Sequence, residues 1–331
     1  MLLKMLSQEE IERIHQATLE VLWKTGIYFW NSPAAVRILE NAGCRVKGKK
    51  VFYPPELVEK TLKLVPNRNR LKLYSRDGKT NIGLKQGEAH FITIGSPYYV
   101  FDFDTGRQRD IVEADVERVG VFFDNLNNFE VGVDQGIGNP VTHNARMKGE
   151  KQSSRYETAE KAIAFFRSRV GIATKKPLLV CTGRSREDVR LGILAHLVFR
   201  NSLEDLQQRP LDTTWVNPVS PLQYDEQTEG MLEGVKWGIP TMFSPEVMMG
   251  TTGPVTLAGS LVQQNAEVIA GIVLAQLLNP GIMTIYGTVG ASVDLRVGDI
   301  SMGSIETVMF DAACVQMADF YGMPTLSLIH I

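Results

Sequence analysis

Apolar residues recur at helical spacing near the N-terminus of the chain. They follow a capping box, Ser7-x-x-Glu10, and predict an amphipathic helix over residues 7–26. A second helix is predicted over residues 32–43, where it stops at a glycine. A third is predicted over residues 54–64, where Pro-Pro-Glu opens the pattern and Val-Pro ends it. Helices this short are typical of an appendage to a larger domain.

The pattern changes to short alternating strands after residue 71. Two strands flank a turn at Asp77-Gly78, and a further hairpin turns at Asp104-Thr105-Gly106. This piece is predicted to be antiparallel β-structure. We therefore expect residues 1–109 to form an N-terminal extension of helices and antiparallel strands.

From residue 110 onward, short apolar strands alternate with long helical stretches, a pattern typical of parallel βαβ units. Six strands are predicted, over residues 129–133, 178–182, 213–217, 240–244, 283–287 and 324–329. The helices between them include residues 186–199, 225–237, 257–278 and 306–321. Residues 139–176 are basic and irregular and fit no such unit.

Parallel strands are covered on both faces, which leaves an open doubly wound sheet or a closed barrel. The segment Gly136-Ile137-Gly138 lacks the third glycine of a dinucleotide-binding fingerprint and opens no helix, which favours the barrel. We expect residues 110–331 to form an α/β fold of the (β/α)8 TIM barrel type. Because the chain ends at a strand and two further units are missing, this barrel is expected to be truncated after about six units.

In a barrel, side chains at the C-terminal ends of the strands converge on one site. The ends of the predicted strands are polar and mostly uncharged, with two carboxylates and several aromatic rings. Aromatic faces with a carboxylate suit a quaternary ammonium ligand, through cation–π attraction and a counter-charge. Trp215 and Phe243 would equally fill layers of the barrel. The candidate catalytic residues are Asn217, Glu246 and Tyr286, and the candidate substrate-binding residues are Asp134, Gln135, Trp215 and Phe243.

A loop rich in glycine and threonine, residues 250–259, leads into the longest predicted helix, with Thr256 as its predicted N-cap. Its backbone amides would bind an anion, or its glycines would let a flat cofactor approach, and a tight βα turn is the structural alternative. Without a Lys-Ser/Thr ending it is no P-loop. Within the helix, a surface stripe would explain two of Gln263, Gln264 and Glu267, whereas a Glu267 facing a packed layer would have more functional interest.

Composition and motifs exclude several classes of function. The formal net charge of the 331-residue chain is −2 with both signs interspersed, so we expect neither nucleic acid nor a membrane as a partner. Three distant cysteines and five scattered histidines argue against a metal site and against disulfides. No secretory signal or uninterrupted apolar span is present, so a soluble, cytoplasmic protein is expected. No nucleophile motif occurs, which suggests that the reactive agent comes from elsewhere.

Four segments closely resemble the trimethylamine methyltransferase family in order and rough spacing: residues 95–106, 250–259, 264–271 and Asn279-Pro-Gly281. The resemblance implies a (β/α)8 barrel that moves a methyl group from trimethylamine or a betaine-type quaternary amine to the Co(I) corrinoid of a partner protein. It fits a chain without its own nucleophile, because cobalt would be the nucleophile. The corrinoid (cobalamin) would be carried by the partner, with no cofactor tightly bound to this chain. The residues expected to contact it are Gly250, Thr251, Thr252 and Gly253.

The resemblance also sets expectations for partners and leaves alternatives open. A cognate corrinoid protein and a methylated amine are the expected partners, in the one-carbon metabolism to which methanogenesis belongs, and we expect a homo-oligomer. Trimethylamine enzymes of methanogens carry pyrrolysine, whereas the betaine-type enzymes lack it. The alternatives are a non-catalytic quaternary ammonium binding protein, an inactive truncated fragment, and a phosphate-dependent lyase, for which the predicted strand ends offer no basic group.

Overall fold

The computed structural model describes residues 3–92, 99–110, 112–130, 176–177 and 185–327, in two compact units. The first unit holds Met1–Leu71, Lys85–Gly87 and Trp215–Ile331, and the second holds Lys72–Leu84 and Glu88–Thr214. These units differ from the division into residues 1–109 and 110–331, because the N-terminal helices pack in the same unit as the strands after residue 214. Of the strand predicted over residues 129–133, only residues 129–130 are described, and they are not in a strand. The rest of that strand, Asp134, Gln135 and the strand predicted over residues 178–182 lie outside the described residues.

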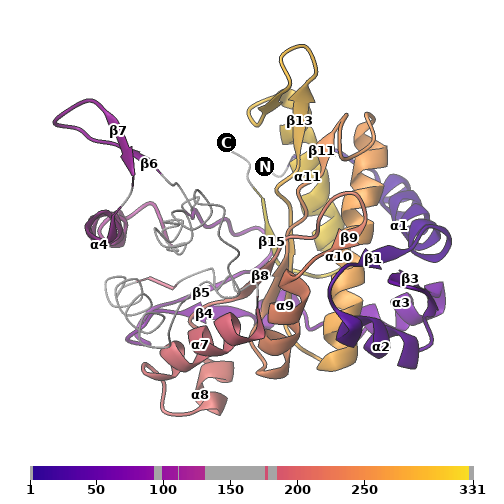
Figure 1. Ribbon diagram of the computed structural model, residues 1–331, viewed down its shortest axis with the longest axis horizontal. Coiled ribbons are helices and arrows are strands. Elements are labelled where there is room, and N and C mark those ends of the chain that lie inside the picture. The colour runs from indigo at the N-terminus through magenta and orange to yellow at the C-terminus, as the bar shows by residue number, and fades with distance from the viewer. Residues whose placement is uncertain (1–2, 93–98, 111, 131–175, 178–184, 328–331) are drawn as a thin grey trace. The chain divides into compact units, whose positions relative to one another are not determined.

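The first unit is built on a four-stranded sheet in the order β8-β10-β12-β15 (Figure 1). Its strands are β8 (Thr214–Val216), β10 (Thr241–Phe243), β12 (Thr284–Gly287) and β15 (Thr325–Leu326), joined in turn by α9 (Gln227–Lys236), α10 (Leu257–Leu278) and α11 (Ile305–Phe320). The pairs β10–β12 and β12–β15 are parallel. Four predicted strands and the three helices between them are therefore confirmed. Among these four described strands, neighbours in the sheet belong to consecutive βα units.

The helix α10 is the centre of the first unit. It packs against α1 (Gln8–Lys24), α2 (Pro33–Asn41) and α3 (Pro55–Leu62) as well as against β10 and β12, so it lies between the N-terminal helices and the sheet (Figure 1). Thr256 caps it by accepting a hydrogen bond from the Gly259 amide, as predicted. Its length and composition would allow it to cross a membrane, but 83% of its most apolar window is buried. It is therefore a core helix, with every residue from Gln263 to Gln276 buried.

The N-terminal segment adds a second sheet to this unit, in the order β2-β3-β1-β9. Its strands are β1 (Ile27–Phe29), β2 (Arg45–Lys47), β3 (Lys50–Phe52) and β9 (Gln223–Tyr224), and β1 pairs in parallel with β9. The capping box at the start of α1 is confirmed, with Ser7 and Glu10 each bonding the backbone amide of the other. The sheet joins the start of the chain to the loop that follows β8.

A small third sheet of the first unit is made by loops beyond the strand ends. It contains β11 (Met248–Met249), β13 (Ala291–Asp294) and β14 (Asp299–Ser301), in the order β11-β13-β14. β13 and β14 form an antiparallel hairpin, and β13 pairs in parallel with β11. The loops after β10 and after β12 are thereby held together.

The second unit contains the two predicted hairpins. These are β4 (Lys72–Tyr74) with β5 (Asn81–Gly83), and β6 (Tyr99–Phe101) with β7 (Gln108–Asp110), both antiparallel as expected. In the first hairpin, Asp77 accepts hydrogen bonds from the Ser75 hydroxyl and the Lys79 amide, and Gly78 takes a positive φ. The described helices of this unit are α4 (Glu113–Asp124), α7 (Arg186–Leu197) and α8 (Leu203–Gln208).

Gly271 tests how tightly α10 lies on β10. A Cβ atom at this position would overlap the Tyr224 hydroxyl and the Phe243 ring. The gain in helix propensity from alanine, about 1 kcal/mol, is smaller than the cost of overpacking, about 1 to 3 kcal/mol. We expect Gly271→Ala to lower the free energy of unfolding by a net amount of about 1 kcal/mol or more in urea titrations. In the control Gly303→Ala, no atom lies within 4 Å of the new Cβ, and a change below about 0.5 kcal/mol is expected. Equal effects at the two positions would contradict this description of the packing.

Candidate functional site

Two of the predicted catalytic residues meet at the carboxyl ends of adjacent strands. Asn217 directly follows β8, and Glu246 follows β10 by three residues. The Asn217 side-chain amide donates a hydrogen bond to Glu246 Oε1 at 2.6 Å, and the Asn217 backbone amide donates to Gln227 Oε1 at 3.2 Å. The Glu246 side chain is exposed. The strand ends thus present a carboxylate to solvent with its orientation fixed by a neutral donor.

The predicted aromatic residues have different surroundings. Phe243 and Tyr286 are paired in register on β10 and β12, and both are fully buried. Phe243 lies against Gly271 of α10, so its ring faces the helix layer and offers no open face to a ligand. Trp215 is only partly buried. Of the predicted aromatic residues, Trp215 alone keeps an exposed surface.

Tyr286 lies in the core instead of at an open strand end. Its hydroxyl has no hydrogen-bond partner among the described residues, and burial raises its pKa well above the usual value. Cys314 of α11 lies near enough to add to this shift. The side chain of Tyr286 therefore packs in the core of the first unit, and its catalytic role stays a prediction.

The glycine loop is a turn closed by its own hydrogen bonds. The Gly250 amide donates to the Gly253 carbonyl, and the Thr251 and Gly253 amides both donate to the Met248 carbonyl. The Thr252 hydroxyl accepts from the Met248 amide at 3.1 Å. Three of the four amides between residues 250 and 253 are therefore used inside the loop and are not available to an anion. The exposed side chains of Thr251 and Thr252 form the outer surface of the turn.

Glu267 faces the packed interior of the first unit. Its Oε1 atom accepts hydrogen bonds from the Leu222 amide at 2.7 Å and from Gln263 Nε2 at 3.0 Å, and its Oε2 atom accepts from the Ser220 hydroxyl at 2.7 Å. The side chain is fully buried, and this burial raises the pKa of the carboxyl group to about 7. The three donors oppose that shift because they stabilise the ionised form. The sequence analysis singled out this residue but did not determine whether its side chain faces the solvent or the interior.

A second buried carboxyl group was missed by the sequence analysis. Asp311 of α11 is fully buried, and burial raises the pKa of this group to about 7. The Thr288 hydroxyl, just beyond β12, lies 3.4 Å from Asp311 Oδ1. The signal was an acidic residue inside an apolar run, Phe310-Asp311-Ala312-Ala313.

The described residues contain no group of three or more His, Cys, Asp or Glu side chains that would hold a metal ion. His15 is occupied by hydrogen bonds with Glu59 and Tyr321. Cys44 and Cys314 are both buried free thiols.

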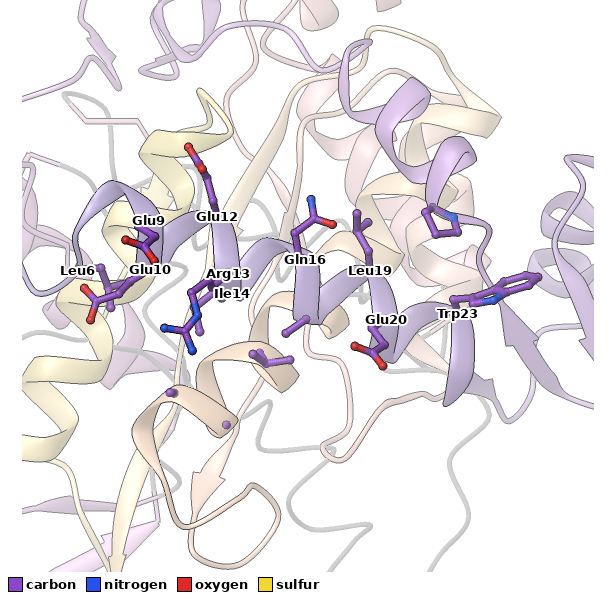
Figure 2. A pocket seen from close by; sticks show the side chains of 15 residues that line it. Leu6, Glu9, Glu10, Glu12, Arg13, Ile14, Gln16, Leu19, Glu20 and Trp23 are labelled. Carbon is purple, nitrogen blue, oxygen red and sulfur yellow. The ribbon is translucent and has the colours of Figure 1, made fainter.

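A groove of about 950 Å³ runs along α1, as Figure 2 shows. Glu9, Glu12 and Glu20 line it together with Arg13, and Val262 of α10 contributes from the other side. None of the predicted catalytic, substrate-binding or corrinoid-contacting residues lines this groove, so it is a separate surface, mainly apolar with charged side chains among the lining residues of α1.

The pH dependence of stability provides a test of the Glu267 environment. The folded-state pKa of about 7 lies above the ordinary value of 4.5, so the folded protein binds this proton more tightly than the unfolded chain. The stabilising contribution is complete below pH 4.5 and is lost as the pH rises to about 7. We expect the wild type to lose about 2 kcal/mol relative to Glu267→Gln between pH 5 and pH 8.

This difference is measured by urea unfolding at both pH values. Asp311 titrates in both proteins and cancels from it. The control Tyr224→Phe removes a hydrogen bond to the backbone carbonyl of Glu267 and should lower the free energy of unfolding equally at both pH values. A difference between wild type and Glu267→Gln that does not vary with pH would refute the assigned environment.

Comparisons with known proteins agree with the resemblance found in the sequence. The family model described as trimethylamine methyltransferase (MTTB) matches residues 1–330. A glycine betaine methyltransferase of Desulfitobacterium hafniense (strain Y51) is 30% identical over 97% of this chain, and trimethylamine methyltransferase MttB of Methanosarcina barkeri is 31% identical over 98% of it. The chain spans 63% of the length of each of these relatives.

Solved structures show the same fold at lower sequence identity. The monomethylamine methyltransferase MtmB of Methanosarcina barkeri superposes with a TM-score of 0.62 at 14% identity, over 98% of this chain and 62% of that chain. A complex of MtmB with hydroxylamine gives the same TM-score at 13% identity. The match over nearly every residue, together with the consecutive parallel βα units, shows that the chain belongs to the trimethylamine methyltransferase family.

Proposed function

We propose that the protein moves a methyl group from trimethylamine or a betaine-type quaternary amine to the Co(I) corrinoid of a partner protein. The observation that carries this proposal is the pairing of Asn217 with Glu246 at the strand ends of a chain that belongs to this family. The names of the relatives, a glycine betaine methyltransferase and a trimethylamine methyltransferase, support both substrates.

The residues at the strand ends have the chemistry that such a substrate needs. A methylated ammonium group is weakly hydrated and is bound by a counter-charge and by aromatic faces. Glu246 supplies the charge, and Asn217 holds its carboxylate at 2.6 Å without neutralising it. The exposed part of Trp215 supplies the aromatic surface. Asp134 and Gln135 remain proposed members of the same site, whereas Phe243 and Tyr286 support it from the core.

The chain itself does not need a nucleophile for this reaction. When the partner is bound, Co(I) supplies the nucleophile, and a methyl group on a positive nitrogen leaves behind a neutral amine. The task of this chain is to bind the cation, remove water and fix one methyl group in place. The turn at Gly250–Gly253 exposes two small threonines, a surface that a flat corrin ring would approach without displacing a long side chain.

The wider expectations follow as proposals. The consecutive order β8-β10-β12-β15 supports a complete protein whose sheet closes into a (β/α)8 barrel. The burial of α10 supports a soluble protein, and we propose a cytoplasmic homo-oligomer that works with a cognate corrinoid protein.

A transfer assay tests the proposed reaction. The purified protein is mixed with a reduced corrinoid protein and with glycine betaine, trimethylamine or monomethylamine, and the absorbance of the corrinoid is followed. Methylation with a quaternary or tertiary amine, but not with monomethylamine, is expected. Calorimetric binding of an amine without any transfer would instead indicate a binding protein.

The Asn217–Glu246 pair is tested by substitution. Glu246→Gln keeps the shape of the side chain and removes the counter-charge, so the dissociation constant for glycine betaine should rise about tenfold or more in calorimetry. Asn217→Ala should have a smaller effect in the same direction, because the charge remains while its orientation is lost. The exposed α11 residue Glu306 provides the control Glu306→Gln, for which unchanged binding is expected. An unchanged dissociation constant in Glu246→Gln would exclude this carboxylate from the site.

A further inference from the structure

One stretch of α10, residues 263–267, holds three strand-end segments by side-chain hydrogen bonds. Gln263 Nε2 donates to the Thr252 carbonyl at 3.0 Å, and Gln264 Nε2 donates to the Gly287 carbonyl at 2.8 Å. Glu267 accepts from the segment after β8, through Ser220 and Leu222. Each of the three α10 side chains is at least nine-tenths buried. A helix that supports the sheet from behind therefore also fixes the segments beyond its strand ends.

Gln263 and Glu267 connect two of these segments directly. Gln263 Nε2 contacts both the Thr252 carbonyl and Glu267 Oε1, each at 3.0 Å. The Leu222 amide bonds to the same Oε1 atom. A continuous path of hydrogen bonds thus runs from the loop after β8, through the Glu267 carboxyl group and the Gln263 amide, to the turn before α10.

Both connected segments belong to the candidate site. Ser220 follows Asn217 by three residues, and Thr252 lies in the turn six residues after Glu246. We propose that Glu267 is a positioning residue, whose carboxyl group ties the segment after β8 to the turn at Gly250–Gly253 and so fixes Asn217 and Glu246 relative to each other. This inference rests on the proposed function only for its effect on transfer. The link between the two segments stands on the hydrogen bonds alone.

The contacts around Glu267 explain why a carboxyl group is needed there. Three donors from three different places converge on its two oxygens, and a smaller or apolar side chain would leave them unsatisfied inside the protein. Among the described residues, Tyr224 and Tyr286 are the groups whose pKa is raised in part by the nearby Glu267 carboxyl group. Both are neutral phenols, so neither supplies a counter-charge to Glu267.

Hydrogen exchange measures the link without reference to catalysis. In Glu267→Ala, we expect the non-proline amides of residues 219–223 and of residues 248–254 to exchange about tenfold faster or more, because the hydrogen bonds at both ends of the path are weakened. In Gln263→Ala, only residues 248–254 should exchange faster, because Glu267 still holds Leu222. The matched control Tyr224→Phe removes a hydrogen bond to the Glu267 backbone carbonyl and should accelerate neither segment.

The exchange pattern decides the inference. If residues 248–254 keep their protection in Glu267→Ala while Leu222 loses it, Glu267 is a local support of one loop and the proposal is wrong. If Glu267→Ala does not fold, Glu267→Gln replaces it, since the amide retains one acceptor oxygen and loses the other. A smaller acceleration in both segments is then expected, and acceleration confined to one segment overturns the proposal.

Transfer kinetics separate a positioning role from a purely structural one. With glycine betaine and a reduced corrinoid protein, Glu267→Gln should raise KM and lower kcat/KM about tenfold or more. The reason is that the Glu246 carboxylate would be displaced and would bind the cation less well. A partly unfolded enzyme would lower kcat per protein molecule and leave KM unchanged. If the wild type transfers no methyl group from any amine, the proposed function fails, while the exchange measurement still decides the role of Glu267.

Discussion

The burial of α10 on every side is the constraint on which the rest of the first unit depends. A helix covered by α1, α2 and α3 on one side and by β10 and β12 on the other cannot leave a polar side chain unpaired without a large cost. Its polar side chains are accordingly bonded to neighbouring segments: Gln264 to Gly287, Asn265 to Thr18 and Tyr321, and Gln276 to Ile282. Gln264 and Asn265 make these bonds through their amide nitrogens, and their side-chain oxygens have no partner among the described residues. The buried polar groups of this helix therefore determine where the surrounding loops lie.

Local signals predicted the elements well where they were strong. The capping box at Ser7, the N-cap at Thr256 and the helix stops before each strand are short-range features, and the structure confirms the elements that they mark. The sheet formed by β1, β2, β3 and β9 was not predicted, because these strands have two or three residues each and are stabilised by pairing with distant segments. The compact units follow those distant contacts, which periodicity does not report.

The candidate site likewise contains residues that local sequence signals identified and others whose role depends on contacts between distant segments. Asn217 and Glu246 were identified because both follow parallel strands, and parallel strands end at the same edge of a sheet. The orientation of Phe243 and Tyr286 depends on which face of a three- or four-residue strand each occupies, and a shift of one residue reverses it. The turn at Gly250–Gly253 was recognised from its composition, but only its backbone geometry shows that the amides are already used. The role of Glu267 is seen only in the three-dimensional structure, since two of its three hydrogen-bond partners, Ser220 and Leu222, lie more than forty residues away along the chain.

The parallel pairing of β1 with β9 has a consequence for the order in which the chain folds. Trp30 and Gln223, joined by a side-chain hydrogen bond beside this pairing, are separated by 193 positions. At a synthesis rate of about 5 to 20 residues per second, the N-terminal strand waits on the order of 10 to 40 s for its partner to leave the ribosome. During that interval α1 and β1 can pack only on early elements such as α2, α3 and β3, and they lack the cover that β9 and α10 provide. The packing of the first unit can therefore be completed only late in translation, after β9 and α10 have been synthesised.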